Sequence, residues 1–246
     1  VGENVGKKIA YLCAADAASQ NDCEAMQKQM KSQHGADPAY VAHVQEKEVD
    51  FRTHMQKIKT AGVDGIMIAA LAETMARALI QSYEAGIPAS VRRIGSSSAS
   101  NSPVPNIAGD AAKGVFFAAA YAAADTRPVA RLFNEMVKQR YGIPAPDHDF
   151  SQAYDLVRIA EIALGNAKLK LDSGSLAADR TAIRDAIANV KNYNGLGSGP
   201  ISFCAAPTPQ CRDGNRTAVL IAYKKGGKNY VTEVLARVTM PADFGL

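Results

Sequence analysis

Two of the four cysteines flank a short loop that contains two prolines. Cys204 and Cys211 enclose the sequence Ala-Ala-Pro-Thr-Pro-Gln, and segments typical of strands lie on either side, at 199–203 and 217–223. Prolines stiffen a turn and direct the chain back on itself, so the two sulfurs can come within disulfide distance. We expect a Cys204–Cys211 disulfide, which indicates an oxidising compartment. The alternative is a pair of reduced thiols on the surface of a cytosolic protein.

The other two cysteines lie at the end of a predicted strand (Cys13) and early in the helix that follows it (Cys23). They could pair across the strand–helix turn or remain two buried thiols. A zinc site would need further ligands at short spacing, such as Cys-x-x-Cys. No such spacing exists, and the histidines lie far from the cysteines: His34, His43, His54 and His148. We therefore expect no metal site and no cofactor.

The sequence lacks the motifs that mark several enzyme classes. It has no Gly-x-Ser-x-Gly nucleophile turn and no phosphate-binding Gly-x-x-x-x-Gly-Lys-Ser/Thr loop. The glycine-rich segment 195–199 precedes a predicted strand, whereas a dinucleotide-binding loop follows one. We expect no catalytic residues.

Charge and hydropathy exclude two further classes. The net charge of the 246 residues is only +4, and no run of Lys and Arg resembles the basic stripe of a nucleic-acid binder. No apolar stretch reaches the roughly 18 residues that span a bilayer. The first eight residues lack the features of a signal peptide. Either a signal was removed or the chain begins within a longer precursor, and we favour the second interpretation.

Strand and helix patterns alternate over the first 114 residues. Such alternation predicts a parallel sheet with helices on both faces, an α/β fold. The predicted strands are 8–13, 40–44, 65–69 and 90–94, and the predicted helices are 22–34, 50–60 and 73–84. In such sheets, ligands bind at the carboxyl ends of the strands. This rule selects four segments: 14–21, 45–49, 70–72 and 95–102.

One of these segments contains the run Ser96-Ser97-Ser98-Ala99-Ser100. Its hydroxyls could hydrogen-bond a polar ligand, although the same composition is typical of a flexible surface loop. Arg92 and Arg93 just before it could face an anion, but we expect an exposed strand end.

The second half of the chain has a different organisation. Residues 115–124 are apolar and predict a strand, and the predicted helices 129–141, 150–165 and 178–190 follow. Two final strands are expected at 218–223 and 229–235, joined across Gly226-Gly227.

Three segments carry a resemblance to a known family. They are Val49-Asp50-Phe51 with residues 57–66, the run Asn106 to Val115, and the run Asp149 to Asp155. In this order they resemble the branched-chain amino acid type of periplasmic solute-binding protein, the type I two-lobe fold of ABC importers. The resemblance covers nearly the whole chain but only the last two-thirds of the family's length.

The resemblance implies a domain organisation. Residues 1–114 would form the C-terminal lobe, 115–124 a strand crossing between lobes, and 125–198 helices returning to the N-terminal lobe. Residues 199–246 would form the disulfide hairpin and the final strands. Because the front of the N-terminal lobe is missing, its helices would need another partner, such as a second copy of the chain.

The resemblance also implies ligand-binding residues, which fall in the segments chosen by the sheet rule. They follow the first, third and fourth strands or approach from a returning helix: Ala18, Ser19, Gln20, Leu71, Ala72, Ser96, Ser97, Ser98, Phe150 and Tyr154. Amino-acid binders of the family hold the ligand's ammonium with an acidic residue near Ser97. A serine cannot neutralise a buried cation, so a carboxylate, amide or aromatic solute is favoured over a free amino acid.

The function implied is a non-enzymatic, extracytoplasmic solute-binding component of an ABC importer. Its partners would be a small polar solute and a membrane permease, with no nucleic acid. Two alternatives stay open: a ligand-sensing domain of a receptor or regulator on the same fold, and a flavodoxin-like enzyme.

Overall fold

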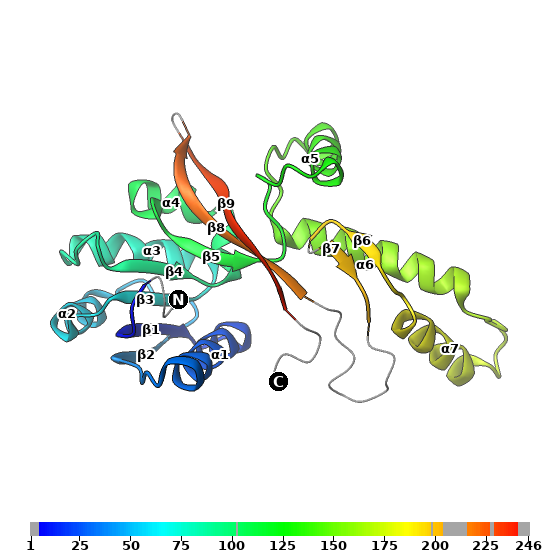
Figure 1. Ribbon diagram of the computed structural model, residues 1–246, viewed down its shortest axis with the longest axis horizontal. Helices are drawn as coiled ribbons and strands as arrows, with labels where there is room; N and C mark the ends of the chain where they lie inside the picture. Colours follow the sequence, from blue (N-terminus) through cyan, green and yellow to red (C-terminus); the bar gives the residue numbers. More distant parts are fainter. Residues whose placement is uncertain (1–4, 102, 198, 204–215, 227–228, 241–246) are drawn as a thin grey trace. The chain divides into compact units, whose positions relative to one another are not determined.

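Seven strands form one sheet in the order β2-β1-β3-β4-β5-β8-β9 (Figure 1). The structure is a computed structural model that describes residues 5–101, 103–197, 199–203, 216–226 and 229–240. β1 pairs in parallel with β2 and with β3, and the β3–β4 and β4–β5 pairs are also parallel. The strands are β1 (Ile9–Ala14), β2 (Tyr40–Val44), β3 (Gly65–Ala69), β4 (Arg92–Gly95), β5 (Phe116–Ala119), β8 (Arg216–Gly226) and β9 (Asn229–Met240).

The helices between the first strands cover both faces of the sheet. They are α1 (Ala17–His34), α2 (Arg52–Ala61) and α3 (Ala72–Glu84). The connection through α1 leads from β1 to one neighbour, whereas those through α2 and α3 lead in the opposite direction along the sheet. Right-handed crossovers therefore place α1 on one face and α2 and α3 on the other. Covered on both faces, all six residues of β1 are buried, which explains its continuous apolar sequence.

Helix α1 begins five residues earlier than the sequence pattern predicted. Asp16 is the N-cap, and its side chain accepts a hydrogen bond of 2.9 Å from the backbone N–H of Ser19. This cap satisfies a helical N–H that has no partner within the helix, so the chain can become helical directly after β1. Gly35, in the left-handed conformation, ends the helix as expected.

Cys13 and Cys23 form a disulfide between β1 and α1, with 6.0 Å between their Cα atoms. Both residues are fully buried in the apolar cluster that joins the sheet to α1, together with Tyr11, Met30 and Met67. Of the two outcomes left open by the sequence, the disulfide is the one observed. The predicted Cys204–Cys211 disulfide lies outside the described residues.

The chain divides into two compact units. Unit 1 contains Val1–Ala119 and Leu220–Leu235, and unit 2 contains Ala120–Val219 and Ala236–Leu246. Unit 1 also holds three short helices after β4: η1 (Ser97–Ser100), α4 (Pro103–Ala108) and η2 (Gly109–Ala112). Unit 2 contains α5 (Pro128–Tyr141), α6 (His148–Asn166), α7 (Leu176–Ala188) and the antiparallel pair β6 (Tyr193–Gly195) and β7 (Gly199–Ile201).

The core of unit 2 is small and built around one aromatic pair. Tyr121 and Phe133 meet edge to face with their ring centres 5.8 Å apart, and Leu196 and Val137 pack beside them.

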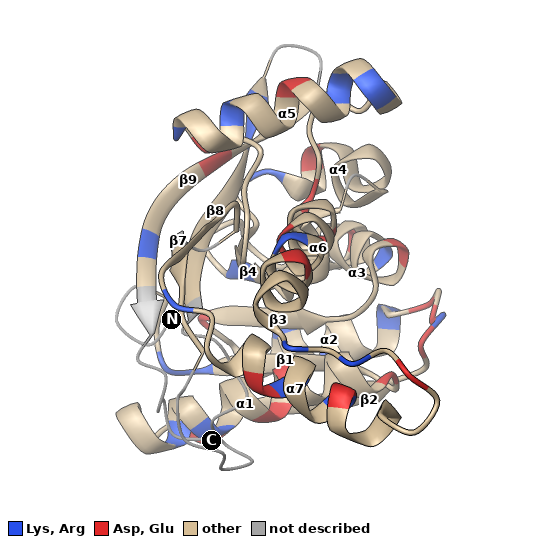
Figure 2. Ribbon diagram, turned by 90° about the vertical axis from the view of Figure 1, so that its right-hand side faces the viewer, with Lys and Arg blue, Asp and Glu red and all other residues tan. Residues whose placement is uncertain are grey.

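Lys and Arg residues are interspersed with Asp and Glu residues over the helices (Figure 2). None of the described helices is long and apolar enough to span a membrane.

Two expectations for the second half of the chain were wrong. The apolar run 115–124 forms a strand only at Phe116–Ala119, because Tyr121 leaves the sheet to enter the core of unit 2. The strand patterns on either side of the cysteine loop were expected to form a hairpin. Instead β7 pairs with β6, and β8 joins the seven-stranded sheet.

Removing the Cys13–Cys23 disulfide is expected to destabilise the protein. Closure of so short a loop contributes about 3 kcal/mol in the chain-entropy model. The double variant C13A/C23A should lose about that much free energy of unfolding in a urea titration. An unchanged urea midpoint for C13A/C23A would contradict this prediction.

Candidate functional site

The topology selects one edge of the sheet in unit 1. The chain leaves β1 toward β2 on one side and returns to β3 on the other, so the connections diverge between β1 and β3. Cys13 lies opposite Ala69 in the register, and Ile68 lies opposite Gly95. The carboxyl ends of β1, β3 and β4 are therefore level with one another. The crevice at such a switch point is where open α/β sheets bind ligands.

The segment after β1 forms the beginning of α1 rather than a free loop. Ala18 is exposed and Gln20 half-buried, whereas Ser19 is only 4% exposed. The amide of Gln20 donates to the carbonyl of Ala15 over 3.4 Å. Of the three residues predicted here to bind a ligand, Ala18 and Gln20 are the more accessible.

Asp16 stands out at this edge, and the sequence-based list of binding residues omitted it. One of its carboxylate oxygens caps α1, while the other, Oδ2, is buried and has no hydrogen-bond partner among the described residues. Partial loss of solvent around Asp22 and the negative charge of Asp16 raise the pKa of Asp22. A buried carboxylate oxygen without a donor is unfavourable, so Oδ2 is suited to accept a hydrogen bond from a bound molecule.

The segment after β3 presents the start of α3. Leu71 is the N-cap and is 44% exposed, and Ala72 begins the helix half-buried. No side chain caps this end. The first N–H groups of a helix carry partial positive charge and attract anions. The apolar side chain of Leu71 lies directly before these N–H groups, so this end offers both an apolar surface and backbone donors.

The serine run after β4 is ordered. Ser96 is 5% exposed, its N–H donates to Ile68 O over 3.2 Å, and its hydroxyl lies 3.5 Å from Ala70 O. These contacts tie the end of β4 to the end of β3. Ser97 and Ser98 follow in the first turn of η1 and are half-buried. The run is thus a short 3₁₀ helix at the selected edge, with two hydroxyl-bearing residues partly accessible.

Arg92 and Arg93 lie at the opposite end of β4. Arg92 is exposed as expected, but Arg93 is only 2% exposed. Its guanidinium donates to the carbonyls of Ile87, Pro88 and Val91 and lies 4.1 Å from the centre of the Tyr83 ring. Burial lowers the pKa of Arg93. These contacts hold the end of α3 to β4, so the expectation of an exposed strand end was wrong for Arg93.

The remaining predicted binding residues lie on α6 in unit 2. Phe150 is 37% exposed and Tyr154 is 38% exposed. The Tyr154 ring packs against Phe133, with 5.5 Å between ring centres. Each residue therefore keeps part of an aromatic ring accessible.

The sequence profile of the family described as periplasmic binding protein matches residues 1–238. The chain belongs to the periplasmic binding protein family. No sequence among curated proteins matches it at a significant level.

Solved structures share this periplasmic binding protein fold. One is a solute-binding protein of an ABC transporter from Rhodopseudomonas palustris BisB5, crystallised with 3,4-dihydroxybenzoic acid. It is 23% identical to this chain, with a TM-score of 0.77, and the match covers 96% of this chain and 61% of that one. A second from R. palustris, with 4-hydroxybenzoate, is 20% identical, with a TM-score of 0.79 and coverages of 100% and 64%. The leucine-binding protein LivK from Thermotoga maritima MSB8 is 21% identical, with a TM-score of 0.75 and coverages of 96% and 62%. The chain thus spans under two-thirds of the length of these structures.

Proposed function

We propose that this chain is the solute-binding component of an ABC-type importer. It would act outside the cytoplasm, bind a small polar solute without chemical conversion and deliver it to a membrane permease. The observation that carries this proposal is the switch-point edge formed by β1, β3 and β4 in a member of the periplasmic binding protein family. A ligand-sensing domain could use the same edge. Transport is favoured because the similar structures include solute-binding proteins of ABC transporters.

Unit 1 would be the C-terminal lobe and unit 2 part of the N-terminal lobe. On this assignment Ala18, Gln20, Leu71, Ser97 and Ser98 are the proposed solute-binding residues of unit 1. Phe150 and Tyr154 are the proposed solute-binding residues of unit 2.

The solute class best supported is a small carboxylate, with an aromatic acid as the leading candidate. The uncapped start of α3 supplies N–H donors for a carboxylate, and the hydroxyls of Ser97 and Ser98 supply further donors. The resemblance places the acid of the family's amino-acid binders near Ser97, where this chain has serines, so an ammonium group would lack its counter-charge. Two similar structures hold 4-hydroxybenzoate and benzoate. A phenolic hydroxyl could in addition donate to the unpaired oxygen of Asp16.

A thermal-shift experiment tests this proposal. A solute at a hundred times its Kd stabilises a protein by about 2.7 kcal/mol, which raises the Tm of a chain of this size by roughly 5 to 10 °C. We expect 4-hydroxybenzoate or benzoate to produce such a shift and leucine to produce none. Ser97→Asp should abolish the shift with the carboxylates, because it places a negative charge beside them.

The matched control is Thr60→Asp, which adds the same charge at the end of α2, by the opposite edge of the sheet. It should leave the carboxylate shift intact. A wild-type protein that responds to no solute class would contradict the transport proposal, and equal responses of both variants would contradict the assignment of Ser97.

We also propose that the chain associates with itself through one face of α6. Ser151, Asp155, Ile159 and Ala163 form the buried face of this helix. The opposite face carries apolar residues at alternating spacings of four and three, which we call the α6 stripe: Ala153, Val157, Ala160 and Leu164. Val157 is 65% exposed and Leu164 is 49% exposed. Helices with this spacing pair along such a stripe, and alanines at alternate positions allow close approach.

Sedimentation analysis tests this association. At micromolar concentrations the wild-type chain should sediment as a dimer, and Val157→Asp should yield monomers because the charge would be buried in the interface. Gln152→Asp, on the same helix but outside the stripe, should leave the dimer intact. A wild-type chain that is already monomeric would contradict self-association through this face.

A further inference from the structure

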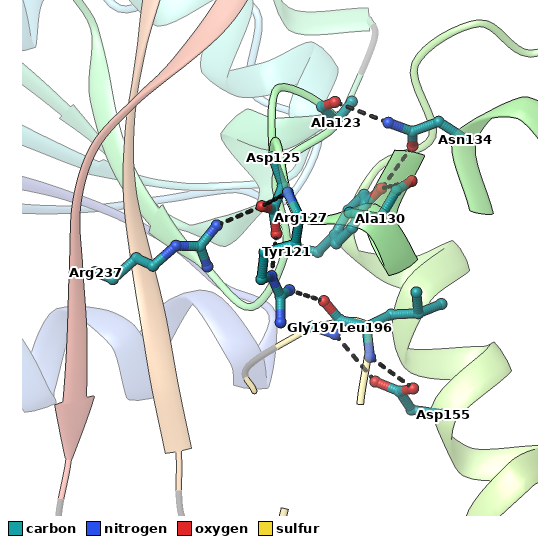
Figure 3. Close-up of polar contacts among 10 residues, drawn as sticks. All are labelled: Tyr121, Ala123, Asp125, Arg127, Ala130, Asn134, Asp155, Leu196, Gly197 and Arg237. Carbon is teal, nitrogen blue, oxygen red and sulfur yellow. Dashed lines mark hydrogen bonds and ion pairs between the residues drawn. The ribbon is translucent and has the colours of Figure 1, made fainter. Parts of the chain in front are cut away.

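The chain passes between its two units at three points, after Ala119, Val219 and Leu235. On the unit 2 side, the first connection carries a negatively charged residue and the third carries a positively charged one. Asp125 lies six residues after the first crossing, and Arg237 lies two residues after the third. Their ion pair, at 2.8 Å, joins the two connections directly (Figure 3).

Asp125 is the centre of this contact and is only 4% exposed. Its carboxylate accepts from the backbone N–H of Arg127 over 3.0 Å and from the guanidinium of Arg127 over 2.7 Å. Burial alone would raise the pKa of Asp125, but the hydrogen bonds from Arg127 and Arg237 outweigh it and lower the pKa. The carboxylate is therefore held ionised by two guanidinium groups.

The contacts of Arg127 extend to a distant turn. Its guanidinium also donates to the carbonyl of Leu196, between β6 and β7. From α6, the buried carboxylate of Asp155 accepts from the N–H of Leu196 over 2.9 Å and from the N–H of Gly197 over 3.1 Å. The peptide group between Leu196 and Gly197 is thus held at its oxygen by a cation and at its nitrogen by an anion. Such chains of hydrogen bonds polarise and strengthen one another.

Gly197 brings this turn against the first connection. A Cβ at this position would lie 3.2 Å from the carbonyl oxygen of Ala120, closer than side chains normally approach. The absence of a side chain allows the turn to pack against the backbone of Ala120.

The rest of the first connection is fixed on both sides of a short gap. In unit 2, the hydroxyl of Tyr121 donates to Asn134 over 2.5 Å, and the Asn134 amide donates to the carbonyl of Ala123 over 2.8 Å. In unit 1, Phe116 and Phe117 pair with β4. Between these two sets of contacts lie the end of β5 at Ala119 and the backbone of Ala120, against which Gly197 packs.

We propose that Asp125, Arg127, Arg237 and Asp155 form an anchor that makes two of the three connections rigid on the unit 2 side. The segment from Tyr121 to Arg127 and the part of β9 around Arg237 are then held together within unit 2. The four charges sum to zero, and loss of both arginines would leave the buried Asp125 carboxylate without a counter-charge, which is strongly unfavourable. Asp125 and Asp155 are positioning residues that act through Arg127 and the Leu196–Gly197 peptide.

Hydrogen exchange with mass spectrometry tests the anchor through a site that the altered residue does not touch. In Asp125→Asn, which keeps the shape but removes the charge, we expect exchange at least tenfold faster both at 120–127 and at 194–197. Exchange at 116–118, within the sheet, should match the wild type. Asp185→Asn removes a carboxylate of an exposed ion pair on α7 and should change neither segment.

A change confined to 125–127 would overturn the proposal, because the distant turn would then be independent of Asp125. A change that spreads into 116–118 would also overturn it, because the effect of the anchor would then not be limited to the unit 2 side. Should Asp125→Asn fail to fold, Asp155→Asn gives the reciprocal test. It should accelerate exchange at 120–127, which Asp155 does not contact, and unchanged exchange there would overturn the proposal.

Discussion

The parallel pairing of β1 with β2 on one side and with β3 on the other is the constraint on which the rest of unit 1 depends. It requires the connections through α1 and α2 to diverge, which covers the sheet on both faces and places the switch point at its carboxyl edge. Burial on both faces in turn requires β1 to be apolar throughout. Polar groups at this edge must therefore come from residues just beyond the strands.

These residues are held by contacts that the sheet itself supplies. The disulfide between Cys13 and Cys23 ties the start of α1 to β1, and Ser96 ties the end of β4 to that of β3. The edge is thereby prearranged, and under the proposed function a solute would not have to order it on binding, which favours affinity. Unit 2 obtains its order differently, from a small aromatic core and from buried carboxylates paired with arginines and backbone N–H groups.

The strands of unit 1 could be predicted because their signal is local. Apolar runs bounded by glycine or by helical patterns located β1 to β4 within two residues. The start of α1 was missed because Ala14 to Asn21 resembles a loop in composition, although Asp16 three residues before Ser19 is a recognisable cap signal. The short strand β6 was missed because three residues carry too little pattern.

The contacts of unit 2 were beyond the reach of sequence reasoning. Asp155 binds a turn 41 residues away, and Asp125 pairs with an arginine in the last strand. Nothing in the spacing of these residues signals that they meet, since only the folded chain brings them together. For the solute edge, in contrast, the rule that ligands gather at strand ends selected the same segments that the topology later placed side by side.

The central claim, that a small carboxylate binds at the edge formed by β1, β3 and β4, can be tested most directly by NMR. The backbone amide signals of the isotope-labelled chain would be followed during titration with 4-hydroxybenzoate. The account predicts that the largest shifts in unit 1 fall at residues 15–20, 70–73 and 96–98. Shifts that gather instead at the opposite edge, around Arg92 and Thr60, or that fail to appear at any concentration, would contradict it.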